Sequence, residues 1–171
     1  MMIDQSNRPV DWVESIMQRN KDKVYRTALA IMCNVADAED VFQDVFMKLF
    51  EKQPEFESFE HETAWLIRVT ANMCKSRLRS FERKNTQPLL DTYPAQSGTQ
   101  HELIELVLSL PYKYKIAIHL FYYEGYSIKE IAEMTGQKAS TVGNHLARAR
   151  RMLKNYLEED LADESLQGLF R

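Results

Sequence analysis

The feature that most constrains the fold of this chain is a helix–turn–helix pattern at residues 127–153. Ser127 and Glu130 have the spacing of a capping box, which predicts a short helix that stops at Gly136. A longer helix is expected over residues 139–157, because apolar residues recur on one of its faces at steps of three and four. These apolar residues are Val142, Leu146, Ala149, Leu153 and Tyr156. Two helices joined by such a short turn must pack closely against each other.

The opposite side of the second helix has the chemistry of a DNA-binding surface. Asn, His and Arg offer the donors and acceptors that base edges require, and Lys and Arg neutralise phosphates. Residues 138–154 contain five basic residues and no acid, which disfavours the alternative of a merely solvated basic face. Because the second helix of such a motif enters the major groove, we expect seven residues to face duplex DNA. They are Lys138, Ser140, Thr141, Asn144, His145, Arg148 and Arg151.

The rest of the chain is also expected to be helical. No segment alternates like a strand, and only five Gly and five Pro disfavour an all-β architecture. Further helices are expected over residues 11–33 (one or two helices), 37–52 with Asp37 as N-cap, 62–83, 102–110 and 111–125. Residues 85–101 contain Pro88, Pro94 and Gly98 without sustained periodicity, which is typical of a flexible linker. We therefore predict an all-α fold with two small helical domains, residues 1–84 and 102–171.

Cysteine usage and hydropathy point to a protein of the cytoplasm. Cys33 and Cys74 lie in apolar helical patterns and lack CxxC spacing, so we expect two buried structural thiols in a reducing compartment. The first twenty residues have no apolar core run, and no segment approaches the ~18 apolar residues of a membrane span. We expect neither a signal peptide nor membrane insertion.

The net charge of −3 averages over segments of opposite sign. Residues 36–62 contain nine acids and two Lys (net −7), and residues 65–84 contain six basic residues and one acid (net +5). An acidic total would argue against a nucleic-acid partner, but this distribution leaves basic helices suited to DNA and an acidic helix suited to a protein. Pairing between the two segments inside the molecule is an alternative for part of this charge.

The basic helix at 65–84 has an ordered layout. Its polar stripe consists of Arg68, Asn72, Lys75, Arg79 and Arg83, and Trp65, Val69 and Met73 form an apolar stripe on another face. Basic residues interrupted by an Asn fit a nucleic-acid backbone with one base-reading position. Phe56 and Phe59, in the preceding loop, could stack on an unpaired base, and the alternative is that they pack back onto the core.

Enzymatic chemistry has little support in this sequence. Asp40 and Asp44 share a helix face, but acids at this spacing are more typical of a solvated surface than of a general acid–base pair. The four His have no metal-ligand spacing, and no Gly-rich phosphate loop is present. We expect no catalytic residue, no cofactor and no metal.

Three segments in order resemble the sigma factors of bacterial RNA polymerase of the extracytoplasmic-function (ECF) type. They are DAEDVFQDVFMKLF (37–50), WLIRVTANMCKSRLR (65–79) and LPYKYKIAIHLFYYEGYSIKEIAEMTGQKASTVGNHLARAR (110–150). The resemblance covers about Val13 to Leu157. Where the family usually has Lys-Ser-Arg in the recognition helix, this chain has Gly143-Asn144-His145, and Ser76 replaces a frequent Asp.

The resemblance implies a function and a set of partners. The chain would be an alternative sigma factor that binds core RNA polymerase and directs initiation at promoters. The acidic helix would bind the clamp helices of the β′ subunit, and the apolar flank of the helix–turn–helix would meet the β flap. The polymerase-binding residues would be Asp40, Gln43, Asp44 and Lys48. Family members are commonly held inactive by an anti-sigma factor, so such a partner is expected.

The resemblance also assigns the promoter contacts. Residues 56–62 would form a pocket for a flipped non-template base of the minus-10 element. Contacts in this pocket must offset the few kcal/mol that unstacking the base costs. The minus-10 residues would be Phe56, Phe59, Arg68, Asn72, Lys75, Arg77 and Arg79. The helix–turn–helix would read the minus-35 element as duplex.

A stand-alone helix–turn–helix regulator is the alternative function. The acidic segment 36–62 favours the sigma factor, since a simple repressor or activator has little use for it. The tail 158–171 has five acids and one Arg (net −4). It could contact a regulator or fold back on a basic face, and a frayed terminus is the simplest expectation.

Overall fold

The computed structural model of the chain describes residues 10–83 and 106–163, and these residues contain helices and no strand. The predicted all-α class is therefore confirmed. Contacts group the chain into two compact units, one built on α1, α2 and α3, and the other on α5, η2, α7 and most of α6. The predicted linker at 85–101 lies outside the described residues, so the exact domain boundaries stay a prediction.

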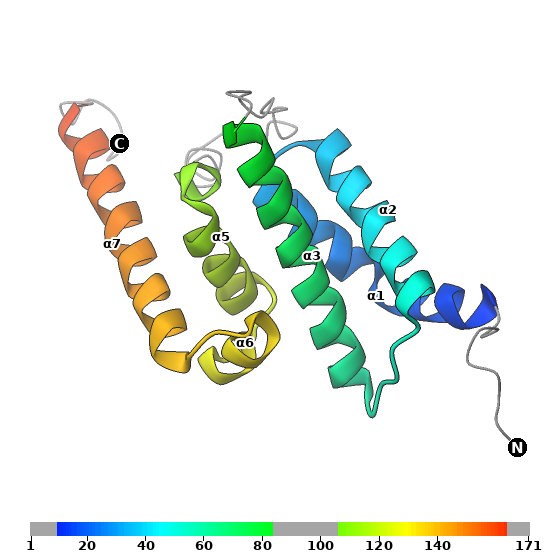
Figure 1. Cartoon of the computed structure of the whole chain (residues 1–171). Helices are drawn as coiled ribbons and strands as arrows, with labels where there is room; N and C mark the ends of the chain where they lie inside the picture. Colours follow the sequence, from blue (N-terminus) through cyan, green and yellow to red (C-terminus); the bar gives the residue numbers. More distant parts are fainter. Residues whose placement is uncertain (1–9, 84–105, 164–171) are drawn as a thin grey trace, which may run out of the picture. The chain divides into compact units, whose positions relative to one another are not determined.

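The N-terminal unit is a three-helix arrangement (Figure 1). Its helices are α1 (Val10–Met32), α2 (Val35–Lys52) and α3 (Phe59–Arg83), and α1 packs against both of the others. Residues 11–33 thus form one helix rather than two. Apolar side chains at helical spacing fill the core of this unit, and its fully buried members include Ile16, Val24, Ile31, Val41, Val45, Leu49, Leu66 and Ile67. Cys33 and Cys74 are both buried, as predicted.

The start of α2 differs from the prediction. The N-cap is Asn34 and not Asp37, because the Asn34 Oδ1 accepts a hydrogen bond from the Asp37 N–H at 2.9 Å. Cys33 has a left-handed backbone conformation (φ 55°), so the chain changes direction within the two residues between α1 and α2. Asn34 therefore occupies the N-cap position, three residues before Asp37. Asp37 still lies in the first turn, where its carboxylate favours the helix dipole. The predicted end at Lys52 is confirmed.

The start of α3 also lies earlier than predicted, at Phe59 instead of Glu62. The Ser58 hydroxyl accepts a hydrogen bond from the His61 N–H at 3.1 Å, which satisfies one of the free donors of the first turn. The predicted loop at 56–62 is therefore short, and its second half is helical.

The C-terminal unit contains α5 (Tyr112–Ile118), which passes directly into the π-helix η2 (His119–Tyr123). Gly125, with φ 78°, ends this segment where the prediction placed its end. The buried His119 stabilises η2, because its ring stacks on Tyr123 and its Nε2 lies 3.4 Å from the Glu124 carboxylate. Helix α5 packs against α7.

The helix–turn–helix is present at the predicted place. Helix α6 (Ile128–Thr135) opens on the capping box: the Ser127 N–H donates to Glu130 Oε2 at 2.7 Å, and the Glu130 N–H donates to Ser127 Oγ at 3.2 Å. Gly136 (φ 69°) closes it, and α7 (Ala139–Asp163) begins at the predicted residue. Helix α7 is six residues longer than predicted, and an ion pair between Lys154 and Glu158 (3.7 Å) joins the predicted part of the helix to the first residue of this extension.

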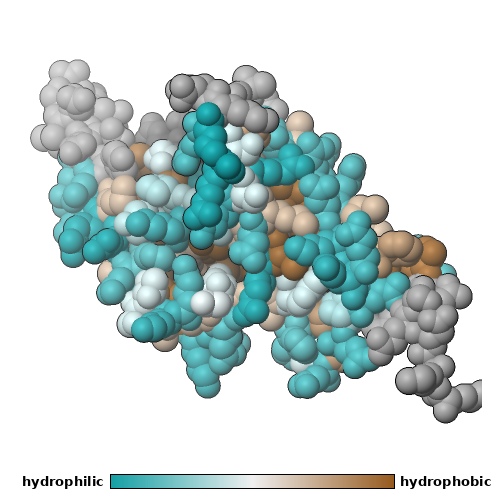
Figure 2. Space-filling view, viewed as in Figure 1, coloured by the Kyte–Doolittle hydropathy of each residue, from teal (hydrophilic) through white to brown (hydrophobic). Residues whose placement is uncertain are grey.

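The apolar stripe of α7 forms the core of the C-terminal unit. Val142, Leu146 and Ala149 are fully buried, as is Ile131 of α6. The face drawn in Figure 2 is mostly hydrophilic, with hydrophobic residues confined to smaller patches among the hydrophilic ones. In the part of the chain that the structure describes, no helix is both long enough and apolar enough to cross a membrane.

Candidate functional site

The predicted duplex-reading residues gather at the start of α7 and on its outer side. Five of the seven are exposed: Lys138, Ser140, Asn144, Arg148 and Arg151. Thr141 is half-buried. The Lys138 carbonyl accepts the first hydrogen bond of the helix, from the Val142 N–H at 3.1 Å, so Lys138 stands at the N-terminus of α7. The buried stripe on the other side leaves this polar face free of core packing.

His145 is the member of this set that turns toward α5. It is half-buried, and its ring meets the Tyr114 ring edge-on, with 5.7 Å between centroids and 83° between planes. Burial, helped by the charges of Lys113 and Arg148, lowers the pKa of His145 below its ordinary value. The imidazole is therefore neutral at neutral pH. Its predicted DNA contact stays a prediction.

Two arginines of α7 lie near tyrosines of the same unit. The guanidinium of Arg148 lowers the pKa of Tyr114 below its ordinary value, and the charge of Lys113 acts in the same direction. Arg150 Nε donates to the Tyr122 hydroxyl, and its guanidinium lies 5.8 Å and 5.5 Å from the ring centroids of Phe121 and Tyr122. Arg150 is thus held against η2.

The polar stripe of α3 is exposed along its length: Arg68, Asn72, Lys75, Arg79 and Arg83. On the other side of the helix Val69 is buried, and Trp65 and Met73 are half-buried. The stripe is therefore a continuous basic surface, interrupted by one Asn, on the N-terminal unit.

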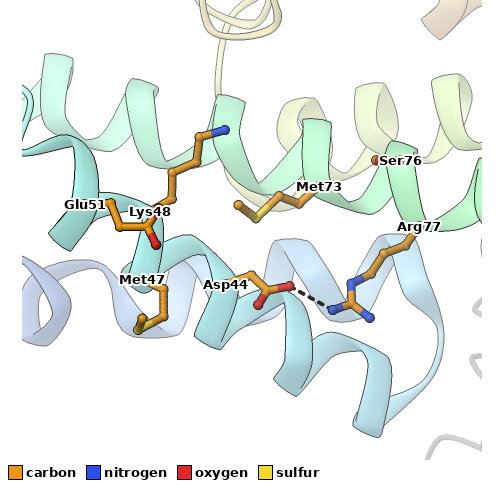
Figure 3. A pocket seen from close by; sticks show the side chains of 7 residues that line it. All are labelled: Asp44, Met47, Lys48, Glu51, Met73, Ser76 and Arg77. Atoms are coloured by element: carbon orange, nitrogen blue, oxygen red, sulfur yellow. Dashed lines mark hydrogen bonds and ion pairs between the residues drawn. The ribbon is translucent and has the colours of Figure 1, made fainter.

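Arg77 lies away from this stripe, on the side of α3 that faces α2. Its guanidinium contacts Asp44 at 2.8 Å and Asp40 at 3.5 Å, as Figure 3 shows for Asp44. The hydrogen bond to Asp44 and the nearby carboxylates raise the pKa of Arg77. The structure brings this arginine together with two of the predicted polymerase-binding acids, and its predicted contact with DNA phosphate stays a prediction.

The predicted polymerase-binding residues share the outer face of α2. Asp40, Gln43 and Asp44 are exposed, and Lys48 is half-buried. Between α2 and α3 lies a groove of about 420 Å³, into which Lys48 and Met73 point (Figure 3). The groove is lined by Asp44, Met47, Lys48, Glu51, Met73, Ser76 and Arg77. Acidic, basic and thioether groups are mixed here, so the face offers both charge pairs and apolar contact to a protein partner.

The two loop phenylalanines have different environments. Phe56 stacks on Trp12 at 6.3 Å between ring centroids, and it meets the rings of His61 and Trp65 edge-on at 5.6 and 5.9 Å. Phe59 is 52% exposed in the first turn of α3. The alternative of packing back onto the core thus describes Phe56, and Phe59 remains available for stacking on a base.

A buried polar network, not predicted from the sequence, holds the start of α3. The carboxylate of Glu62 accepts hydrogen bonds from Arg19 (2.7 and 3.2 Å) and from the Asn20 amide (2.7 Å). The Thr63 hydroxyl donates to Asn20 Oδ1 at 2.9 Å. In the sequence, this network is indicated by Asn20, a polar residue that lies four positions from Ile16 within the apolar stripe of α1.

Among the described residues, no group of three or more His, Cys, Asp or Glu is arranged to hold a metal ion. The expectations of no metal and no cofactor stay predictions.

Comparisons with known proteins define the class of the chain. The family described as Sigma-70 region 2 matches residues 16–84, and the family described as Sigma-70, region 4 matches residues 100–153. The two matched segments correspond to the unit of α1–α3 and the unit with the helix–turn–helix. This pair of regions is that of a sigma factor.

Curated relatives narrow the class. The chain is 30% identical over 149 residues to the ECF RNA polymerase sigma factor SigM of Mycobacterium tuberculosis, covering 84% of this chain and 76% of that protein. It is 30% identical over 167 residues to SigE of Mycolicibacterium smegmatis, covering 90% of this chain and 64% of the longer relative. The chain belongs to the ECF family of RNA polymerase sigma factors, which are transcription initiation factors.

A solved structure has the same fold. The sigma factor RpoE of Bartonella quintana, determined in complex with the anti-sigma factor NepR, aligns with a TM-score of 0.73 and 24% identity over 87% of this chain and 98% of that one.

Proposed function

We propose that this chain is the promoter-specificity subunit of a bacterial RNA polymerase, with its contacts divided among three surfaces. The outer face of α2 binds core polymerase, the stripe of α3 with Phe59 binds the minus-10 element, and the start of α7 reads the minus-35 element. The observation that supports this division is that each compact unit carries its own exposed basic face. No catalytic residue takes part, and the chain acts where core polymerase is, in the cytoplasm.

At the minus-35 element, Asn144 and Arg148 are the proposed base readers. An Asn amide pairs with the adenine edge and an Arg guanidinium with the guanine edge, and each such bidentate contact discriminates by about 1–3 kcal/mol. Lys138, Ser140 and Arg151 lie around them and bind phosphates, which fixes the register of α7 on the duplex.

At the minus-10 element, the α3 stripe binds the backbone of the melted strand and Phe59 stacks on an unpaired base. Base–aromatic stacking contributes about 1–3 kcal/mol, which is similar to the few kcal/mol needed to extrude the base. The buried network of Glu62 fixes the first turn of α3, so Phe59 and the stripe are held in one geometry.

On α2, Asp40, Gln43, Asp44 and Lys48 are the proposed contacts with the β′ clamp helices. An anti-sigma factor is a proposed second partner, because the similar sigma factor RpoE was solved in complex with one.

Binding measurements with and without core polymerase test the function. We expect the purified chain to bind core polymerase, and to bind promoter duplex tightly only as part of that complex. Asp40→Ala should weaken core binding, whereas Glu14→Ala, which removes an exposed acid from α1, is the matched control. A stand-alone regulator would instead bind duplex DNA tightly by itself and ignore core polymerase.

A further inference from the structure

The further inference concerns Asn20, a residue of α1 that no motif marks for DNA binding. It is 2% exposed, and its amide forms hydrogen bonds where α1 packs against α3. The Nδ2 group donates to the Ile16 carbonyl at 3.0 Å and to Glu62 Oε1 at 2.7 Å. The Oδ1 atom accepts from the Thr63 hydroxyl at 2.9 Å. One side chain therefore joins its own helix to two consecutive residues of α3.

This set of bonds requires an amide at position 20. An Asn side chain has two N–H donors and a carbonyl acceptor, and both kinds of group are used here. The Glu62 carboxylate also accepts two bonds from Arg19, at 2.7 and 3.2 Å, and its side chain is 7% exposed. A carboxylate so far removed from water depends on each of its donors, so the bond from Asn20 has a large effect on its position.

The surroundings of the network indicate a positioning role in addition to stability. Ile16, Leu66 and Ile67 are fully buried in the same core. Replacing a buried ionic network by well-packed apolar residues is often neutral or stabilising, so such a network is a poor source of stability. Hydrogen bonds are directional, whereas apolar burial is not. The network therefore fixes the register of α3 against α1 more narrowly than apolar packing would.

The network lies one turn from the residue proposed to stack on an unpaired base. Phe59 precedes Glu62 by three positions and Thr63 by four, so the three residues share one side of the start of α3. The Glu62 N–H also donates to the Ser58 carbonyl at 3.0 Å, which links the network to the first backbone bond of the helix. Because Phe59 is 52% exposed, its position depends mainly on the helical turn that carries it.

We propose that Asn20 is a positioning residue for the minus-10 element, whose bonds to α3 hold the first turn of that helix so that Phe59 meets the unpaired base. This rests on the proposed function, in which Phe59 stacks on that base. It goes beyond it by assigning control of promoter opening to a residue of α1 that does not touch DNA.

Two matched threonine variants test the proposal without removing the ion pair. Thr63→Val removes the hydroxyl bonded to Asn20 and keeps the shape of the side chain. Thr70→Val is the control, because it removes a buried hydroxyl that bonds inside α3, to the Leu66 carbonyl at 2.7 Å. The holoenzyme opens a promoter, defined by mapped transcription starts, that carries a fluorescent base in its minus-10 element. We expect Thr63→Val to slow opening roughly two- to tenfold and Thr70→Val to keep the wild-type rate, with equal core binding.

Two double mutants separate positioning from a structural effect. In a Phe59→Ala background, Thr63→Val should cause no further loss of opening rate, since the ring that it positions is absent. Asn20→Asp should slow opening more than Thr63→Val does, because it sets a second carboxylate against Glu62. Adding Glu62→Gln restores a donor and an acceptor between these two positions, so it should recover most of the rate that Asn20→Asp loses.

The outcomes distinguish the two levels of the proposal. If Thr63→Val opens the promoter at the wild-type rate, or if its loss persists in full without the Phe59 ring, the positioning role is wrong and the proposed function stands. The same conclusion follows if Glu62→Gln recovers none of the rate lost in Asn20→Asp. If Phe59→Ala itself opens the promoter like wild type, the proposed stacking at the minus-10 element is wrong.

Discussion

Arg77 provides the sharpest prediction about how the basic residues of α3 are divided. The structure pairs Arg77 with Asp44 at 2.8 Å and Asp40 at 3.5 Å, whereas Lys75 belongs to the exposed stripe. The two carboxylates already offset the positive charge of this guanidinium, so it should contribute little to neutralising a phosphate. We therefore expect Arg77→Ala to leave promoter binding by the holoenzyme unchanged in its salt dependence.

The expected change in the salt dependence of promoter binding follows from counterion release. Each phosphate contact contributes about 0.7 to the slope of log K against log salt for a single strand and about 0.9 for B-DNA. Lys75→Ala should reduce the slope by about this amount and serves as the positive control. Arg77→Ala should leave this slope unchanged.

The same substitution should have a measurable effect on stability. The Arg77 side chain is 30% exposed and that of Asp44 is 52% exposed, so their ion pair is partly screened by solvent and contributes about 0.2–1 kcal/mol. In a double-mutant cycle measured by urea unfolding, Arg77→Ala and Asp44→Ala should show a coupling energy in that range. A fall in salt slope for Arg77→Ala equal to that for Lys75→Ala, with no coupling to Asp44, would show instead that Arg77 contacts DNA phosphate.

Three further predictions concern the start of α3 and the packing of α7. Glu62→Ala should lower the free energy of unfolding by about 2 kcal/mol in urea titrations, because it removes a buried acceptor from Asn20, while the half-exposed Arg19 regains water. Phe59→Ala should reduce promoter opening, followed by a fluorescent base in the minus-10 element, with a loss of about 1–3 kcal/mol and little change in stability. The pKa of His145 is lowered in the folded state, so the unfolded chain takes up a proton first as the pH falls below 6.5, and stability measured by urea unfolding should decrease in that direction.

Each of these has a control that shares its chemistry. Glu60→Ala removes an exposed acid from the same turn as Glu62 and should change stability by less than about 0.5 kcal/mol. Phe56→Ala should lower stability instead of promoter opening, because its ring packs on Trp12. His145→Gln should abolish its share of the pH dependence, and an unchanged slope would show that other groups cause it.

The C-terminal unit could be predicted closely because its signals are local. The capping box and the glycine at 136 depend on residues within one or two turns, and both were found in place. In the apolar stripe of α7, Val142, Leu146 and Ala149 are buried and Leu153 is half-buried, while the side chain of Tyr156 lies outside the described residues. The π-helix at 119–123 was missed, since a single extra residue in a helical turn leaves the apolar pattern nearly unchanged.

What the sequence did not predict in the N-terminal unit has a local cause at the start of α2 and a tertiary cause at α3. Asn34 and Asp37 are both good N-caps, and the choice depended on the left-handed backbone of Cys33. A helical wheel separates Arg77 from the α3 stripe, but only the packing of α2 against α3 supplies its carboxylate partners. The pairing of Glu62 with Arg19 joins residues 43 positions apart, which no sequence period indicates.

Transcription from genomic templates by core polymerase with the purified chain tests the central claim most directly. We expect transcripts that depend on the added chain and whose mapped starts share two upstream elements, at minus 10 and minus 35. A folded chain that binds core polymerase or duplex DNA and yet yields no new transcript from any template would contradict it.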